Sequence, residues 1–224
     1  MEHAAAHAVA VRWRNLPLGA RTALEEQWRG LAARGLPCGA AVTDADGRLL
    51  ASGHNRAYEP STGEHPLERT RLAHAELNAL ARLDTDADWS ATTLWSTQHP
   101  CSMCAAAIEF TGVGRVVFVA SDPSDDASPA EVAATRRGAT YLELGDPYWW
   151  VVSNLLFLTT GAFLRGDRDD NVALARHRMP GTAALAVELA AVDALGSAAA
   201  AGLSLPDGIH AFDEAIAGLA GEAT

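Results

Sequence analysis

The sequence predicts an α/β fold: a three-layer α/β/α sandwich around a central mixed sheet of about five strands, followed by an α-helical C-terminal extension. Up to about residue 142, short β-branched and apolar runs alternate with amphipathic helical stretches. Such alternation places helices on both faces of one sheet. Beyond that point the patterns are helical, and a chain of 224 residues with 49% hydrophobic residues can form a substantial core.

Local signals delimit the elements of the first two thirds of the chain. The first helix is amphipathic and ends at Gly35-Leu36-Pro37, and the turn Asp44-Ala45-Asp46-Gly47 joins the two strands that follow. Ser128-Pro129-Ala130-Glu131 is a capping box that begins a later helix. The expected elements are, in order, a helix at 20–34, strands at 39–43 and 49–53, a helix at 71–83, a strand at 92–97, a helix at 100–110, a strand at 114–120, a helix at 129–137 and a strand at 139–142.

The last third of the chain is predicted to be helical. Asp146-Pro147 caps an apolar helix, and Met179-Pro180-Gly181 separates two later ones. We expect the helices after the apolar one to complete a core or a subunit interface rather than to carry chemistry, with shaping of the substrate pocket as the alternative. The expected helices lie at 148–164, 170–178, 182–200 and 207–219.

Two short segments carry residues with metal-binding chemistry: His74-Ala75-Glu76 and Pro100-Cys101-Ser102-Met103-Cys104. One imidazole and two thiolates are typical zinc ligands, and a catalytic zinc keeps its fourth position for water or hydroxide. We therefore predict one catalytic Zn²⁺ per subunit, bound by His74, Cys101 and Cys104. Glu76 is the predicted catalytic residue, close enough to handle the proton of that water without binding the metal.

The local sequence places both segments at helix starts. Pro100 suits the first turn of a helix, where its missing N–H would be unpaired anyway. Cys101 and Cys104 then lie one turn apart on one face, near the positive end of the helix dipole, which favours thiolates. His74 and Glu76 lie near the start of the preceding helix. Two helix N-termini would thus assemble the site.

Other interpretations of these residues have weaker support. A redox Cys-x-x-Cys pair needs no upstream His-x-Glu, and a closed structural zinc site needs a fourth Cys or His. The remaining cysteine, Cys38, stands in an apolar stretch and is interpreted as a small buried hydrophobe. A non-catalytic binding module that keeps zinc for stability remains an alternative. Glu76 argues against it, because a structural site has no use for a carboxylate outside the coordination shell.

Residues from about 20 to 142 resemble the cytidine deaminase-like superfamily, whose signature is His-x-Glu followed by Pro-Cys-x-x-Cys. The Pro-Cys-x-Met-Cys form resembles the branch containing guanine, cytosine and tRNA adenosine deaminases. The strand–turn–strand ending in Gly53-His54-Asn55 is also similar to that branch. The resemblance implies a cytidine deaminase-like fold and a hydrolase acting on C–N bonds of cyclic amidines. Its implied reaction converts the exocyclic amine of a guanine- or cytosine-like heterocycle to a carbonyl and releases ammonia.

The same resemblance implies roles for individual residues. Asn55 and the backbone N–H of Ala75 would bind the base. His99 stands where many members of the branch have a glutamate, and we expect a substrate contact or a partner of the metal ligands there, with a solvent-facing residue as the alternative. Apart from the resemblance, Trp95 is a candidate for stacking on the substrate ring, although core packing is the more ordinary interpretation of this residue. The predicted domains are a partly flexible N-terminal segment at 1–19, a zinc deaminase domain at 20–165 and the helical extension at 166–224.

Composition favours a small aminated heterocycle as the partner. With 17 Lys and Arg against 28 Asp and Glu, the net charge is −11, whereas proteins that bind nucleic acid display a basic stripe. Editing of tRNA adenosine is the alternative function. Three cysteines fit a reducing cytoplasm, and neither a signal peptide nor a membrane-spanning run is apparent. We expect a cytoplasmic enzyme of nucleobase metabolism, and the resemblance implies a homodimer.

Overall fold

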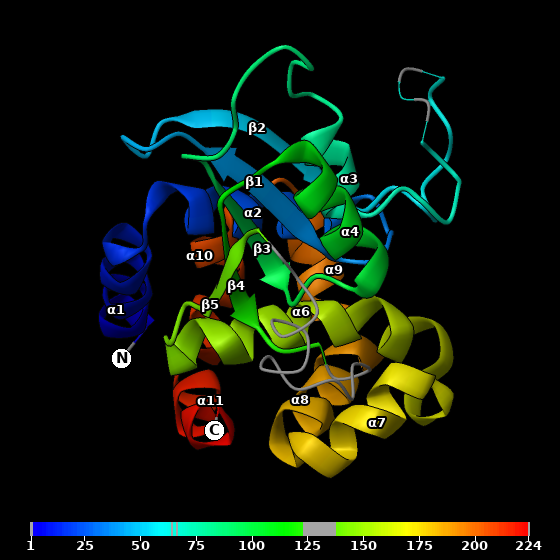
Figure 1. Cartoon of the computed structure of the whole chain (residues 1–224). Helices are drawn as coiled ribbons and strands as arrows, with labels where there is room; N and C mark the ends of the chain where they lie inside the picture. Colours follow the sequence, from blue (N-terminus) through cyan, green and yellow to red (C-terminus); the bar gives the residue numbers. More distant parts are fainter. Residues whose placement is uncertain (1, 64, 66, 123–137, 224) are drawn as a thin grey trace.

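A mixed sheet with helices on both faces forms the centre of the structure (Figure 1). The computed structural model describes residues 2–63, 65, 67–122 and 138–223, with side chains from residue 6 onward. These residues form five strands, which confirms the predicted three-layer α/β/α class. The strands are β1 (Gly39–Thr43), β2 (Leu49–His54), β3 (Thr93–Gln98), β4 (Arg115–Ala120) and β5 (Thr140–Glu143).

The strands lie in the order β2-β1-β3-β4-β5. β1 is antiparallel to β2 and β3, whereas β3, β4 and β5 run parallel to one another. In the turn between β1 and β2, the Asp44 side chain accepts hydrogen bonds from the backbone N–H groups of Asp46 and Arg48. Gly47 completes this turn with a φ of 79°, a conformation that glycine adopts without strain. The predicted hairpin is therefore confirmed.

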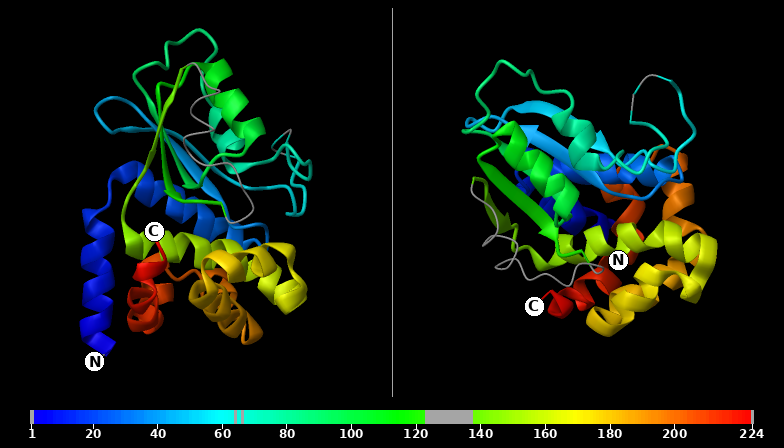
Figure 2. Two further views of the ribbon diagram at one scale, coloured as in Figure 1. Left: turned by 60° about the horizontal axis from the view of Figure 1, so that its bottom comes forward. Right: turned by 45° about the vertical axis from the view of Figure 1, so that its right-hand side comes forward.

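Helices cover the two faces of the sheet in pairs. α2 (Leu18–Ala32) and α6 (Pro147–Arg165) lie on one face, called the α2/α6 face below (Figures 1 and 2). α3 (Ala75–Leu80) and α4 (Ser102–Thr111) lie on the other, the α3/α4 face. α2 packs so closely on β1 that a Cβ at Gly39 would lie 2.0 Å from the Ala23 carbonyl oxygen. Glycine at this position therefore lets the helix approach the sheet.

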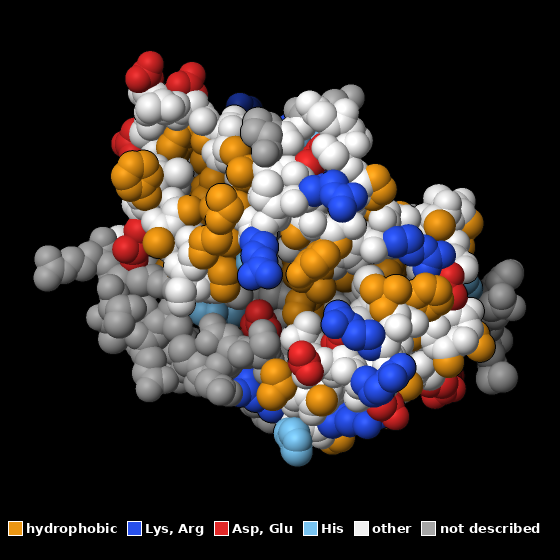
Figure 3. Space-filling model, turned by 90° about the vertical axis from the view of Figure 1, so that its right-hand side faces the viewer, with side chains coloured by type: hydrophobic (Ala, Val, Ile, Leu, Met, Phe, Trp, Pro, Cys, Tyr) orange, Lys and Arg blue, Asp and Glu red, His pale blue; other side chains and the backbone are white. Residues whose placement is uncertain are grey.

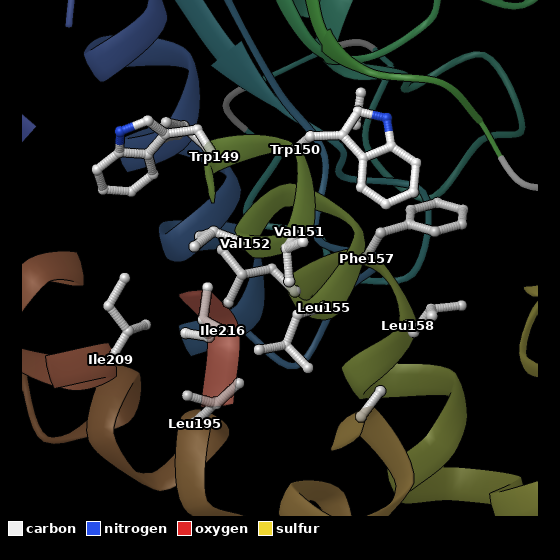
Figure 4. Close-up of a cluster of buried hydrophobic side chains, with 14 of the residues drawn as sticks. Trp149, Trp150, Val151, Val152, Leu155, Phe157, Leu158, Leu195, Ile209 and Ile216 are labelled. Atoms are coloured by element: carbon white, nitrogen blue, oxygen red, sulfur yellow. The ribbon is translucent and has the colours of Figure 1, made fainter. Parts of the chain in front are cut away.

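Each face has its own hydrophobic cluster. The larger one, on the α2/α6 face, includes the fully buried Trp149 and Leu155 of α6 and extends into the later helices. Figure 4 shows Leu195 and Ile216, from two of those helices, beside α6. The smaller cluster, on the α3/α4 face, includes Leu94 of β3. α6 is therefore the central helix of the larger cluster.

Further helices surround α6. The Asp146 side chain accepts hydrogen bonds from the N–H groups of Tyr148 and Trp149, as the predicted cap requires. Among the described helices, none alone has the length and apolar character to cross a membrane, and one bent pair passes both criteria only when taken together. The other elements are α1 (Glu2–Asn15), η1 (Gly166–Arg168), α7 (Asp170–Arg178), α8 (Pro180–Ala191), α9 (Ala194–Ala200), α10 (Leu205–Ile209), η2 (His210–Phe212), α11 (Asp213–Gly218) and η3 (Ala220–Glu222).

The late helices differ most from the predictions. The prediction of a single helix at 182–200 is wrong, because this part of the chain forms two helices, α8 and α9, which meet at an angle of 61°. Asp193 between them has a φ of 49°, which cannot continue an α-helix, and its carboxylate binds Arg34 at 2.6 Å. The helix expected at 207–219 is likewise divided into α10, η2 and α11.

The ends of the predicted domains gain further elements. No element was expected in residues 1–19, which contain α1 and the start of α2; α1 lies against α10 and α11. The strand expected at 139–142 is present as β5. The helix expected at 129–137 lies outside the described residues. The domain boundaries after residues 19 and 165 stay predictions.

Candidate metal centre and its surroundings

Two helix starts bring the predicted metal ligands together. His74 is the N-cap of α3, with φ −67° and ψ 154°, and Cys101 is the N-cap of α4, with φ −63° and ψ 169°. Cys104 follows in the first turn of α4. The helices predicted at 71–83 and 100–110 therefore begin later than expected, because His74 and Cys101 have extended backbones. Pro100 correspondingly precedes the helix instead of lying in its first turn.

The three ligand atoms have the spacing that zinc requires. Nδ1 of His74 lies 3.5 Å from Sγ of Cys104 and 3.7 Å from Sγ of Cys101, and all three atoms lie within 4.8 Å of one another. A nitrogen and a sulfur bound tetrahedrally to one zinc ion, at about 2.0 and 2.3 Å, are about 3.5 Å apart. These residues thus fit the ion without rearrangement.

The two thiols are coupled. The pKa of Cys101 is lowered to about 3, first by a hydrogen bond from Cys104 and then, against the opposing effect of burial, by one from His74. The same pairing, together with burial, raises the pKa of Cys104. Two thiolates this close to each other need a compensating cation. A divalent metal supplies that charge, because metal binding displaces the thiol proton.

Glu76 lies beside these ligands and is only 6% exposed. Its Oε1 accepts a hydrogen bond from Ser96 Oγ at 3.1 Å, and its Oε2 accepts one from Cys104 Sγ at 3.4 Å. Burial raises the pKa of the Glu76 carboxyl. The structure thus places a buried carboxyl next to the three ligand atoms, on the first turn of the helix that His74 caps.

The two predicted base-binding groups lie in the same part of the fold. Asn55 follows β2 and is 2% exposed. Its Oδ1 accepts a hydrogen bond from the Ala57 N–H at 3.0 Å, so its Nδ2 is the end that can donate to a ligand. Ala75 is the first residue of α3, where a helix leaves its backbone N–H groups without intrahelical partners. Their contact with a base stays a prediction.

His99 is buried rather than solvent-facing, so the alternative of an exposed helix-entry residue is wrong. It is 5% exposed, and its ring meets that of Phe118 edge-on at a centroid distance of 4.8 Å. The Tyr141 ring also lies near it, at a distance of 6.0 Å between the Tyr141 and His99 ring centroids. The two rings therefore hold the His99 imidazole in place, immediately before Pro100 and Cys101 in the chain.

Trp95 is not brought to the metal ligands. Its indole N–H donates to Thr43 Oγ1 at 3.0 Å, and its ring packs against Gly19 of α2. The next residue, Ser96, binds Glu76, and successive residues of a strand point to opposite faces of the sheet. This placement corrects the predicted substrate contact, because Trp95 belongs to the core of the α2/α6 face.

Two residues near the site were not predicted. Cys38 is half-buried rather than fully buried, and its carbonyl accepts a hydrogen bond from the Asn55 N–H at 3.0 Å. Burial raises the pKa of its thiol, and the charges of Glu76, Asp122 and Cys101 add to the effect. Asp122 also helps to raise the pKa of His74, after the larger effects of Cys101 and Glu76. The residues around Asp122 in the sequence do not indicate that the end of β4 brings its charge close to the metal ligands.

His54, the residue before Asn55, forms a buried charged network with Glu26 and Glu59. His54 Nδ1 lies 3.0 Å from Glu26 Oε2, and His54 Nε2 lies 3.1 Å from Glu59 Oε1. Burial alone would lower the pKa of His54, but its bonds to Glu26 and Glu59 raise it. Burial alone would raise the pKa of Glu26, but bonds from His54 and Ser52 and the charge of Arg29 lower it. This network joins α2 to the segment that carries Asn55.

Comparison with known proteins gives matches over the region that contains the site. Residues 17–120 match the model of the cytidine and deoxycytidylate deaminase zinc-binding region. The chain is 33% identical over 101 residues to deoxycytidylate deaminase of Mycobacterium phage D29, covering 45% of this chain and 76% of the phage protein. It is 28% identical over 102 residues to cytosine deaminase of Candida albicans, covering 45% of this chain and 63% of the relative.

Two further matches have related activities in their names. A tRNA-specific adenosine deaminase of Streptococcus pyogenes is 29% identical over 103 residues, covering 45% of this chain and 59% of the relative. The chain thus spans less than two thirds of the length of this protein and of the Candida enzyme. A solved structure of guanine deaminase from Nitrosomonas europaea is 29% identical, with 59% of this chain and 82% of that chain covered and a TM-score of 0.44.

Proposed function

Because the chain belongs to the cytidine and deoxycytidylate deaminase zinc-binding family, we propose that it is a hydrolytic deaminase of a nucleobase or related small heterocycle. The reaction replaces an exocyclic amine by a carbonyl oxygen and releases ammonia. One observation carries the proposal: a buried carboxyl, Glu76, lies beside a complete set of three zinc ligands. A zinc site with a purely structural role has no use for that carboxyl.

The zinc site consists of His74, Cys101 and Cys104. A zinc ion bound there would lower the pKa of a coordinated water toward neutrality. With three protein ligands, the metal would remain able to bind that water, as in other catalytic zinc sites.

Glu76 is placed to carry the protons of the reaction. Ser96 fixes its Oε1, while its Oε2 lies on the side of the metal ligands, where it takes a proton from water and delivers it to a ring nitrogen. Protonation of the ring makes the adjacent carbon more electrophilic. The oxygen of the water then adds to that carbon. Glu76 takes the second proton from the added hydroxyl and delivers it to the exocyclic amine, so that the C–N bond breaks, the carbonyl forms and ammonia leaves.

Other groups around Glu76 hold the substrate ring in place. The Nδ2 of Asn55 donates a hydrogen bond to a ring acceptor, and the N–H of Ala75 donates to a ring carbonyl. The His99 imidazole, which packs against the rings of Phe118 and Tyr141, lies beside the substrate ring and restricts its position. These contacts orient the amine-bearing carbon toward Glu76.

Editing of tRNA is the second candidate, because tRNA-specific adenosine deaminases are among the relatives. The net charge of −11 opposes binding to an RNA backbone. On the face drawn in Figure 3, basic side chains are separated by hydrophobic and acidic ones and form no continuous stripe. A small heterocycle is therefore preferred. The homodimer that the resemblance implies is part of the same proposal, and sedimentation of the purified chain tests it.

The deciding experiment measures ammonia release by the zinc-loaded chain. The panel contains guanine, cytosine, adenine, their nucleosides, deoxycytidylate and a tRNA anticodon stem-loop. We expect turnover of a free base, loss of turnover when a chelator removes zinc, and recovery when zinc is restored. Turnover of the stem-loop alone would favour the editing function. Absence of ammonia from every compound, with one zinc ion bound per chain, would contradict deaminase activity.

A further inference from the structure

α6 contributes buried polar side chains on one side, although most of the helix is apolar. Ser153 and Asn154 are both 0% exposed. Trp150, Asn154 and Phe157 are three or four residues apart and therefore share a face of the helix. In Figure 4, Trp150 and Phe157 project to the same side of α6, away from Ile216 and Leu195. The side of α6 that carries Asn154 therefore faces away from the later helices.

Ser153 shows what that side of α6 touches. Its Oγ donates to the Thr97 carbonyl at 2.7 Å and accepts from Gln98 Nε2 at 3.0 Å. Its own carbonyl accepts from Gln27 Nε2 at 2.9 Å, and the same Nε2 donates to the Pro37 carbonyl at 2.9 Å. One chain segment here leads into Cys101 and the other into Cys38. Ser153 thus lies where both segments approach the metal ligands and Asn55.

A cavity lies against the same side of α6, about one helical turn after Ser153. Phe157 lines a cavity of about 250 Å³ together with Leu36 and Tyr58. Leu36 precedes Cys38, and Tyr58 belongs to the segment that follows Asn55. The side of α6 that carries Asn154 therefore lies between the end of β3, which leads to Cys101, and the segment that follows Asn55.

Asn154 is the unexplained residue on this side of α6. Within the described part of the chain, neither its Oδ1 nor its Nδ2 has a hydrogen-bond partner. The Oε1 of Gln98, whose Nε2 binds Ser153, also has none among those residues. Buried amide groups are nearly always paired, and an unpaired one is destabilising. Three such atoms around Ser153 indicate a group that is satisfied by a ligand.

We propose that Asn154, with Gln98 beside it, binds the ring edge of the substrate and selects bases that carry a ring N–H next to a ring carbonyl. This inference rests on the proposed deaminase function. A carboxamide is neutral and planar, and it offers an acceptor and a donor side by side. It therefore complements the N–H and C=O pair of cytosine or guanine. It has no charge with which to hold a phosphate, and a substituent on the ring nitrogen removes the donor that Oδ1 needs.

The test uses the full, zinc-loaded chain with Glu76→Gln, so that bound bases persist, with and without Asn154→Leu. The probes are cytosine, guanine and their N1-methyl derivatives, and binding is measured by calorimetry. We expect Asn154→Leu to weaken binding of the preferred unmethylated base by about 10- to 100-fold and to remove the preference over its methylated form. Without a base, the melting temperature should not fall, because leucine fills the site without an unpaired polar group.

A matched control is Thr159→Val, since Thr159 is also buried on α6 but donates to the Leu155 carbonyl at 2.7 Å. It should leave base binding unchanged. If Asn154→Leu binds all probes as the parent does, or melts at a lower temperature with unchanged binding, the residue is structural and the inference is overturned while the proposed function stands. If the parent binds none of the probes, the proposed function fails for these bases and the inference fails with it.

Discussion

The two faces of the sheet serve different purposes. On the α3/α4 face, short helices hold His74, Glu76, Cys101 and Cys104 in or beside their first turns, over a small cluster of alanine, valine, leucine and isoleucine. On the α2/α6 face, a larger cluster contains the buried tryptophans and extends into the C-terminal helices. The chemistry uses side chains and unpaired N–H groups at helix starts, whereas stability comes from buried apolar area. One sheet can therefore carry the catalytic residues on one face and the main hydrophobic core on the other.

The largest expected effect tests whether the α2/α6 face carries the stability. Trp149→Ala should lower the free energy of unfolding by about 3–5 kcal/mol, because Trp149 is 0% exposed and its removal leaves a cavity. Urea denaturation measures this change. Trp89→Ala is the control, since Trp89 is half-buried and its indole donates to the Asp84 carbonyl in a loop. An equal loss in both variants would break the comparison.

The next effect tests whether the α3/α4 face carries the chemistry. Glu76→Gln should lower kcat/KM at least about 100-fold, or about 2.7 kcal/mol in the activation free energy, because an amide cannot shuttle protons. Zinc content and melting temperature should not fall. Steady-state ammonia release, metal analysis and calorimetry measure the three quantities. Glu25→Gln, on the exposed side of α2, is the control. Normal turnover by Glu76→Gln would exclude the proposed proton carrier.

A smaller effect concerns the network that links the two faces, Glu26, His54 and Glu59. The raised pKa of His54 stabilises the fold below its unfolded pKa of about 6.5, and this stabilisation is lost as pH rises through the folded pKa. The lowered pKa of Glu26 stabilises the fold above about pH 4.5, and this is lost as pH falls through its folded pKa. The network should therefore stabilise most between about pH 4.5 and 6.5.

His54→Gln tests this window by urea denaturation across pH. At about pH 6, it should lower the free energy of unfolding by about 1–3 kcal/mol, because two buried carboxylates lose a partner. The decline in stability above about pH 6.5 should become shallower than in the parent chain. His177→Gln, on the exposed side of α7, should leave the profile unchanged. A parallel pH profile for His54→Gln and the parent would refute the linkage.

The smallest effect is expected at the surface ion pair between Arg34 and Asp193. Their side chains are 45% and 21% exposed, so water and salt screen the pair. Arg34→Ala should change the free energy of unfolding by less than about 1 kcal/mol, and less still at high salt. Denaturation at two salt concentrations measures it. A loss of several kcal/mol would mean that the α8–α9 bend depends on this pair.

Sequence reasoning recovered the α3/α4 face because its information is local. The ligand types and their short spacings identify a zinc centre, and the strand and turn patterns define β1 to β4. The helix boundaries were less accurate, because the extended backbones of His74 and Cys101 exclude both residues from helices that their neighbours favour. The bend at Asp193 was missed for a related reason, since neither glycine nor proline stands at residues 191–194, and Gly196 lies within α9 instead of at the bend.

The sequence by itself determined the fold class, the three zinc ligands and the carboxyl beside them, because residue chemistry and short periodicities encode these features. The tertiary structure decided which neighbours reach the site. It placed Trp95 in the core, buried His99 against Phe118, and brought α6 with Asn154 to the end of β3. Those outcomes depend on strand register and on contacts between segments far apart in the chain. A single sequence does not specify such contacts locally, because they arise from packing of the whole molecule.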